Sequence, residues 1–229
     1  SANGTATGVS KGQVQIQVHY MNLTATALLN VVEKDEPDAP KQVASINISP
    51  SEPIFLLLNE EQTLSAEAKD IDNEALPDVK DFNWKSNDAN IVSVSQVGLI
   101  KALIYGQAEI TAESGGIQSS PIIVTVGKQG SFQGKNGYNV SGTVILKASH
   151  DNLQLSLSSD FKASDGPDVR IYLSKSIDNI NQSLELATLN SDGAQSYNLP
   201  ADVSITEYRY VVIWCKQFGV LFGNADLGE

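Results

Sequence analysis

Side chains that commonly carry out chemistry are scarce in this 229-residue sequence, which argues against several enzyme classes. Cys215 is the one cysteine, so it forms no disulfide within the chain, and a thiolate zinc site needs several such ligands. A Ser-His-Asp triad would have to use one of the two histidines, His19 and His150. Glycine-rich phosphate-binding motifs are also missing. The sequence therefore offers no catalytic constellation, and a non-enzymatic protein is the favoured interpretation.

Cys215 is nevertheless a redox candidate, because a thiolate can exchange electrons or hold haem iron. The alternative is an inert thiol packed in a strand beside Ile213 and Trp214, since free cysteines are commonly buried. A reactive thiol needs exposure and a positive neighbour. Lys216 is adjacent, but on a strand it points to the opposite face. Both interpretations of Cys215 stay open at this point.

A second set of candidates combines a carboxylate with aromatic rings near the C-terminus. Asp168, Tyr172, Trp214 and Phe218 are the residues that we consider for a pocket holding a flat apolar cofactor or a carbohydrate. As core aromatics of a β-protein, the three rings would need no ligand. Asp168 also lies in a Gly-Pro turn whose carboxylate spacing matches no complete calcium-ligand set, so we expect no metal site.

The charge balance excludes two classes of partner. Lys and Arg number 15 against 27 Asp and Glu, which gives a net charge of −12. A nucleic-acid backbone needs a basic surface, and so does an anionic membrane. Apolar runs are also far shorter than the ~20 residues of a membrane-spanning helix. We therefore expect no nucleic-acid partner and no transmembrane segment in this chain.

Alternation of apolar and polar residues dominates the sequence, as residues 14–18 (VQIQV) illustrate. Turn signals rich in glycine separate the alternating stretches, and at most one helical turn is expected, within residues 177–189. Short strands at this spacing predict an all-β fold of tandem β-sandwiches. The predicted strands are residues 14–18, 43–48, 91–94, 108–112, 122–126, 142–146, 153–157, 169–173 and 210–214.

An internal repeat gives the domain organisation. Residues 4–32 align without a gap on residues 98–126, an offset of 98 − 4 = 94 residues, with Gly12 on Gly106 and Ile16 on Ile110. Residues 1–33 therefore resemble the last strands of a truncated domain, and their unpaired edges and apolar face predict docking on another domain or a second chain. A charged, proline-containing linker is expected at 34–42. A further boundary is expected near 127–130, where the valine-rich strand is predicted to end.

Residues 43–127 resemble the bacterial Ig-like repeat of group two. The resemblance rests on VASINISP at 43–50, EQTLSA at 61–66, WKSN at 84–87, IVSV at 91–94 and GQAEITA at 106–112. It implies an extracellular or periplasmic stalk, often adhesive, with no catalytic residues to transfer. Trp84 would be a core anchor between two sheets, its indole N–H needing one partner.

Residues 130–227 resemble the DM13 electron transfer domain. The resemblance rests on GSF at 130–132, GPDVRIYLS at 166–174 and VVIWCKQF at 211–218. It implies a β-sandwich with a characteristic cysteine at Cys215 and a redox or haem-linked role. The loop at 137–139 reads Gly-Tyr-Asn where family members often carry histidine, which argues against a histidine-ligated haem.

Together these patterns predict an exported binding or adhesion-type protein, secreted, periplasmic or at the cell surface, with a lipid anchor before residue 1 left open. Ig-like modules would present the C-terminal domain to a protein or glycan at the cell envelope. The alternative is a redox module that acts through Cys215 or through a pocket-bound cofactor such as haem.

Overall fold

The computed structural model describes residues 4–32, 41–149, 152–177 and 179–228. Within these ranges the chain consists of β-strands, loops and one 3-10 turn, so the predicted all-β fold class is confirmed. The chain divides into two compact units, residues 1–41 and 42–229. Most of the predicted linker at 34–42 lies outside the described residues, and so does His150.

The first unit is a single hairpin of β1 (Gly12–Tyr20) and β2 (Leu23–Val31). The two strands pair in one uninterrupted antiparallel register through a turn at Met21, where φ is 51°. Apolar side chains of the hairpin are exposed, Val18 to 62%. An isolated two-stranded hairpin is marginally stable in water, so this unit lacks the burial that stabilises a sandwich.

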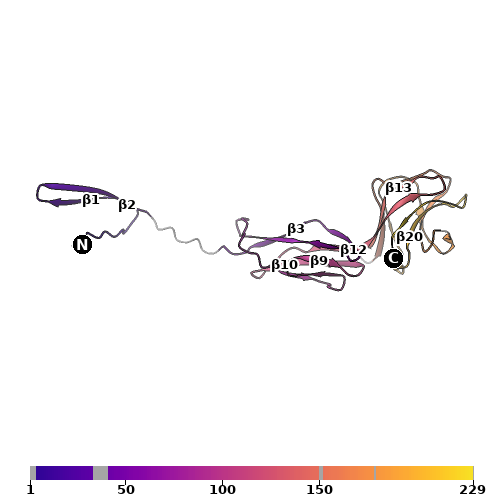
Figure 1. The fold of residues 1–229 in the computed structure, drawn as a ribbon, viewed down its shortest axis with the longest axis horizontal. Coiled ribbons are helices and arrows are strands. Elements are labelled where there is room, and N and C mark those ends of the chain that lie inside the picture. Colours follow the sequence, from indigo (N-terminus) through magenta and orange to yellow (C-terminus); the bar gives the residue numbers. More distant parts are fainter. Residues whose placement is uncertain (1–3, 33–40, 150–151, 178, 229) are drawn as a thin grey trace. The chain divides into compact units, whose positions relative to one another are not determined.

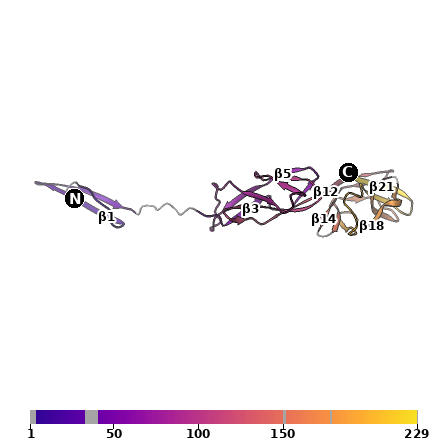
Figure 2. The ribbon, with the colours of Figure 1, turned by 90° about the horizontal axis from the view of Figure 1, so that it is seen from below.

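The Ig-like domain has two layers of strands around one core, seen around the labels β3, β9 and β10 in Figure 1 and around β3 and β5 in Figure 2. Fully buried side chains such as Ile100, Ile110 and Val124 fill the space between the layers. One layer contains β3 (Ser45–Ser49), β5 (Glu61–Thr63), β6 (Ser65–Lys69), β8 (Val92–Val94) and β9 (Leu99–Ala102). The other contains β4 (Ile54–Leu57), β7 (Asn83–Ser86), β10 (Gly106–Ser114), β11 (Ile117–Gln118) and the first half of β12 (Ile122–Gly134).

Strand β12 continues from the Ig-like domain into the C-terminal domain without a break. Val126 pairs with β10 and β4, and two residues later Lys128 pairs with Leu146 on the next domain's first long strand. The sequence predicted that this strand ends at Val126, whereas it continues to Gly134, because partner strands on both sides accept the polar residues after Val126. A Cβ at Gly127 would lie 2.7 Å from the Leu146 carbonyl oxygen and 2.7 Å from the Phe55 ring. Only glycine fits this crossing point without displacement.

The C-terminal domain consists of two sheets that share β12. Residues 128–131 of β12 pair with β14, and residues 132–134 pair with β21. The 3-10 turn η1 (Ile180–Gln182) confirms the predicted helical turn. The first sheet contains β14 (Thr143–Ser149), β15 (Asn152–Leu157) and β19 (Gln195–Asn198). The second contains β21 (Val220–Asp226), β20 (Tyr210–Cys215), β17 (Val169–Ser174) and β18 (Leu184–Thr188), while β13 (Val140–Ser141) pairs with β16 (Lys162–Ala163).

Candidate functional site

Cys215 lies at the end of β20 and points into the core of the C-terminal domain. It is fully buried, pairs across the ladder with Val169, and belongs to the same apolar cluster as Phe222. Neighbouring residues on a strand face opposite sides, so Trp214 and Lys216 point away from this core. The thiol is therefore enclosed by apolar side chains and has no contact with solvent.

The opposite, outer face of this sheet carries an aromatic and charged cluster. Arg170 on β17 is paired across the ladder with Trp214 on β20, and Tyr172 is the next outward-facing residue on β17. The Arg170 guanidinium donates to the Asp168 carboxylate at 2.5 Å and to the Glu185 carboxylate at 2.7 Å. We call Asp168, Arg170, Tyr172, Glu185, Trp214 and Lys216 the outer-face cluster.

Glu185 on β18 is the centre of the outer-face cluster. Its carboxylate also accepts hydrogen bonds from the Lys216 ammonium and the Tyr172 hydroxyl, each at 3.0 Å. The Lys216 bond is the main cause that holds the Glu185 pKa below its ordinary value. Burial, helped by the hydrogen bond to Glu185, raises the pKa of Tyr172 to about 12. The cluster thus keeps a carboxylate charged and a phenol neutral at neutral pH.

The structure divides the residues that the sequence proposed for one pocket. Asp168, Tyr172 and Trp214 lie together in the outer-face cluster, while Phe218 is 59% exposed in the turn after β20. Cys215 lies on the other face of the same strand, so its sulfur and these rings cannot line one cavity. The residues present do not fit a thiolate-ligated haem at Cys215. Sequence reasoning also missed Glu185, because its partners come from β17 and the end of β20, which only the fold brings beside β18.

Aspartates in two loops form bonds within the protein. Asp168 pairs with Arg170, as above, and the Asp70 carboxylate accepts the backbone N–H groups of Asp72 and Glu74 at 3.0 and 2.9 Å. Across the described residues, no group of three or more His, Cys, Asp or Glu side chains is arranged to hold a metal ion.

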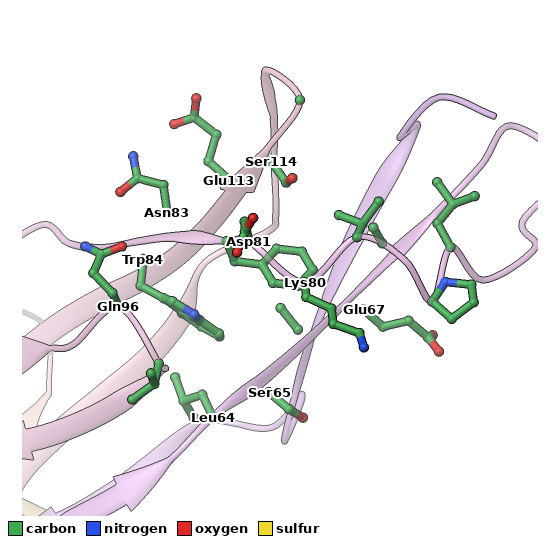
Figure 3. A pocket seen from close by; sticks show the side chains of 18 of the residues that line it. Leu64, Ser65, Glu67, Lys80, Asp81, Asn83, Trp84, Gln96, Glu113 and Ser114 are labelled. Atoms are coloured by element: carbon green, nitrogen blue, oxygen red, sulfur yellow. The ribbon is translucent and has the colours of Figure 1, made fainter. Parts of the chain in front are cut away.

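A groove of about 1070 Å³ opens at one end of the Ig-like domain and was missed by the sequence reasoning (Figure 3). This volume lies slightly above the ~300–1,000 Å³ typical of ligand pockets. The groove is lined by β6, by the loop that leads to β7, and by the turn after β10. Figure 3 shows the Trp84 ring projecting into it between Leu64 and Asp81. The expectation that the indole N–H of Trp84 needs a partner was the one sequence signal that pointed here.

Comparison with protein-family models identifies both domains. The model for the bacterial Ig-like domain (group 2) matches residues 42–126, and the model for electron transfer DM13 matches residues 131–227. The chain joins a group 2 bacterial Ig-like domain to a DM13 domain. Both predicted resemblances are confirmed, with boundaries within a few residues of those expected from the sequence.

Similarity to individual proteins is weaker. No curated protein matches the chain. Domains 4 and 5 of the S-layer protein SbsC are 21% identical, with 52% of this chain and 60% of that chain covered at a TM-score of 0.33. Domains 5–6 of SbsC are 16% identical, with 82% and 97% covered at a TM-score of 0.33. The adhesin InvE of Yersinia pseudotuberculosis is 12% identical, with 80% and 57% covered at a TM-score of 0.24. These TM-scores are all below 0.5, so the similarities to SbsC and InvE say nothing of what this chain does.

A search for membrane-spanning helices in the described part of the chain finds none of sufficient length and apolar character.

Proposed function

We propose that this chain is part of an exported protein of binding or adhesion type, at the cell surface or in the periplasm. Its Ig-like domain acts as a spacer, and its DM13 domain carries the surface that contacts a protein or glycan of the cell envelope. The observation that carries this proposal is the shared strand β12, since a spacer needs a stiff connection to the domain that it presents.

Side chains around β12 reinforce the connection. Lys128 is 3% exposed, its ammonium donates to the Gly228 carbonyl at 3.3 Å, and it lies 5.6 Å from the centroid of the Tyr105 ring. Desolvation is the main cause that lowers the pKa of Lys128. A buried ammonium that bonds to the DM13 domain and faces a ring of the Ig-like domain opposes bending at this point.

The outer-face cluster is the surface that we propose for partner binding. Trp and Tyr rings beside arginine are the residues most enriched at energetically important interface positions. Its ion pairs are partly exposed, so each contributes at most ~1 kcal/mol to folding. Tyr172 is 4% exposed and its hydroxyl donates to Glu185, so the partly exposed Arg170 and Trp214 are the members that a partner would contact.

A redox role through Cys215 is the rival proposal, supported by the description of the DM13 family. Burial of Cys215 opposes it, because thiol exchange needs access to the sulfur. Iodoacetamide labelling of the native chain separates the two proposals. Labelling on the timescale of a free thiol supports the redox role, whereas labelling only after urea unfolding supports the binding role.

Retention of envelope proteins and glycans on the immobilised chain tests the binding role directly. Trp214→Ala and Arg170→Ala are expected to reduce retention at least 10-fold, and Phe218→Ala, at the exposed turn, serves as the matched control. Equal retention by all variants, or none by the wild type on envelope fractions and a glycan array, would contradict the proposal.

We also propose that residues 1–33 are the final strands of a second Ig-like domain, with 34–42 as the linker to the domain at 43–127 and the DM13 domain at 130–229. Support comes from the shared sequence pattern and from the hairpin conformation of residues 12–31. An exposed apolar hairpin is a template for association, so it is expected to dock on another domain or a second chain.

A further inference from the structure

The Trp84 side chain presents an unpaired donor to the groove of the Ig-like domain. The residue is 6% exposed, and within the described chain its indole N–H has no hydrogen-bond partner. The fully buried polar atoms that lack a partner in that part of the chain are Ser86 Oγ and Asn224 Oδ1, so the indole nitrogen remains reachable from the groove. A nearly buried donor that opens into a cavity fits a ligand that supplies an acceptor.

A single backbone position beside this ring is also open. The Leu64 N–H donates to the Gly98 carbonyl at 2.8 Å, and the Ala68 carbonyl accepts from the Leu76 N–H at 2.8 Å. Alternate residues of a strand direct their backbone groups to the same side, so the N–H and C=O of Ala66 point there too. Because Gly98 and Leu76 fill the positions on either side, the described chain leaves room here for one polar group and not for a strand.

The unpaired groups of Trp84 and Ala66 lie close together. A Cβ at Gly98 would lie 3.1 Å from Trp84 Cε2, the ring carbon bonded to the indole nitrogen, and 2.5 Å from the Leu64 carbonyl oxygen. The indole nitrogen is therefore near Leu64, and Ala66 follows two residues, about 7 Å, further along the strand.

One isolated amide fits between these two groups. A trans amide carries its C=O and its N–H on opposite sides. Its oxygen can therefore accept the indole N–H of Trp84 while its N–H donates to the Ala66 carbonyl. A peptide strand presents a row of amides and needs several adjacent open positions, whereas the acetamido groups of an amino sugar are presented singly.

The charges around the groove balance, which favours a neutral occupant. Glu113 lies 2.6 Å from Lys85, and Glu67 lies 3.8 Å from Lys69. The charged residues of the lining, together with these two lysine partners, are three acids and three bases: Glu67, Asp81, Glu113, Lys69, Lys80 and Lys85. A charged ligand would therefore find no net opposite charge to attract it.

Uncharged polar side chains at the rim suit the hydroxyl groups of a sugar. Asn83 and Gln96 are exposed and belong to the lining (Figure 3), and within the described chain neither side-chain amide is hydrogen-bonded to the protein. An amide both donates and accepts, as a sugar hydroxyl does. The apolar part of the lining includes the buried Leu64, Ala68 and Trp84. Apolar walls with a few well-placed polar groups are typical of ligand sites.

We propose that this groove binds a neutral glycan that contains N-acetylated amino sugars. One acetamido group bridges the Trp84 indole N–H and the Ala66 carbonyl, and its methyl group contacts the apolar lining at Leu64. Hydroxyl groups of the same sugar and its neighbours bond to Asn83 and Gln96. This binding site lies in the Ig-like domain and does not depend on the partner proposed for the DM13 domain.

Four probes separate the acetamido group from the sugar backbone, from charge and from a peptide. Tetra-N-acetylchitotetraose carries the acetamido groups. Cellotetraose has the same β-1,4-linked backbone with hydroxyls in their place, and the fully deacetylated chitotetraose carries charged amines instead. The peptide acetyl-Ala-Ser-Ala-amide supplies amides without a sugar.

Titration of the whole chain with each probe, followed by nitrogen-15 NMR, tests the proposal. The two indole N–H resonances are assigned with Trp214→Phe, and their shifts give the affinity. We expect the acetylated tetrasaccharide to shift the Trp84 resonance and to leave that of Trp214 unchanged. The other three probes should bind at least about 10-fold more weakly, since each lacks a bonded group or brings an unmatched charge.

Variants assign the binding to the groups named above, with the backbone amide of Ala66 as the readout. Trp84→Phe keeps a ring and removes the donor, so the affinity should fall roughly 3- to 10-fold. Asn83→Ala and Gln96→Ala change the exposed rim and leave the core intact, and each should weaken binding roughly 3-fold. Asn90→Ala, at an exposed position outside the lining, is the matched control and should leave the affinity unchanged.

Several results would overturn the proposal. One is a Trp84 resonance that does not move at millimolar acetylated tetrasaccharide, and another is unchanged affinity in both rim variants. Equal binding of cellotetraose would show that the acetamido group is not recognised, and tighter binding of the deacetylated tetramer would show that charge decides. Equal binding of the peptide would show that the groove takes a protein segment. A Trp84 resonance that shifts on dilution of the chain alone would show that a second copy occupies the groove instead.

Discussion

The hairpin β1–β2 and the segment β10–β12 share one sequence pattern at an offset of 94 residues, in different surroundings. Matched glycines have nearly the same backbone conformation. The φ values are 71° at Gly4 and 78° at Gly98, and 151° at Gly12 and 152° at Gly106. Local sequence alone is therefore sufficient to predict the same backbone turns in both places.

The surroundings of these glycines differ. A Cβ at Gly98 would lie 2.5 Å from the Leu64 carbonyl oxygen and 3.0 Å from the Trp84 ring, while nothing lies within 4 Å of a Cβ at Gly4. Ala112 in β10 is fully buried, whereas its counterpart Val18 is exposed. The pattern thus forms the hairpin, but only the remaining strands of the sandwich bury its apolar face.

The two regions also differ in register. Near the turn, Glu113 pairs with Gln118 as His19 pairs with Thr24, which is the same register after the offset. Further along, the two ladders differ by one residue. Gly12 pairs with Val31, whose counterpart is Thr125, but Gly106 pairs with Val126 on β12. Ser119 marks the change, since its hydroxyl accepts the Ala112 N–H at 3.1 Å. The hairpin has Ala25 at that position and keeps one regular ladder.

The largest difference is expected from alanine at the matched glycines. Gly98→Ala should lower the unfolding free energy of the Ig-like domain by about 4 kcal/mol or more, because left-handed strain adds to a clash with backbone. Gly4→Ala adds about 1–2 kcal/mol of strain in the segment before the hairpin and should leave the unfolding of the Ig-like domain unchanged. Urea unfolding followed by Trp84 fluorescence, in a Trp214→Phe background, measures both. Equal midpoints for the two variants would remove the distinction between the regions.

A smaller difference is expected from truncation of the matched isoleucines. Ile110→Ala should cost the Ig-like domain about 3 kcal/mol, since it leaves a cavity at a fully buried position. Ile16→Ala, at the corresponding position of β1, should not change that unfolding transition. The same urea experiment applies, and a shift of similar size for Ile16→Ala would show that the hairpin is part of this core.

The smallest effect is expected from a surface ion pair that only one region has. Lys85 lies 2.6 Å from Glu113, and His19 takes the place of Glu113 in the hairpin. Lys85→Met should lower the unfolding free energy of the Ig-like domain by less than ~1 kcal/mol, because the pair is partly exposed. If urea unfolding showed that Lys85→Met lowers this free energy by more than ~2 kcal/mol, the surface ion pair would contribute to stability on the scale of a buried core residue.

Sequence reasoning succeeded where a local rule decides the outcome. Alternation located the strands around Val14 and Ile110, and the same alternation predicted that Lys216 points away from the side of Cys215. It failed where distant strands decide. The continuation of β12 past Val126 depends on β14 and β21, and the role of Glu185 depends on β17 and β20. The groove lined by Ala66 lies beyond the point where β9 starts, at Leu99. Where a strand begins to pair depends on its partner strands, so the local sequence did not predict the groove.

Hydrogen exchange of the native chain, read by mass spectrometry at residues 14–18 and 108–112 in one sample, tests most directly whether this repeated strand pattern is stabilised by burial against other strands. We expect strong protection at 108–112 and weaker but measurable protection at 14–18, from docking of the hairpin on another domain or a second chain. Exchange throughout 14–18 as fast as in an unstructured peptide would contradict the docking of the hairpin, and equally fast exchange at 108–112 would contradict the account of the Ig-like core.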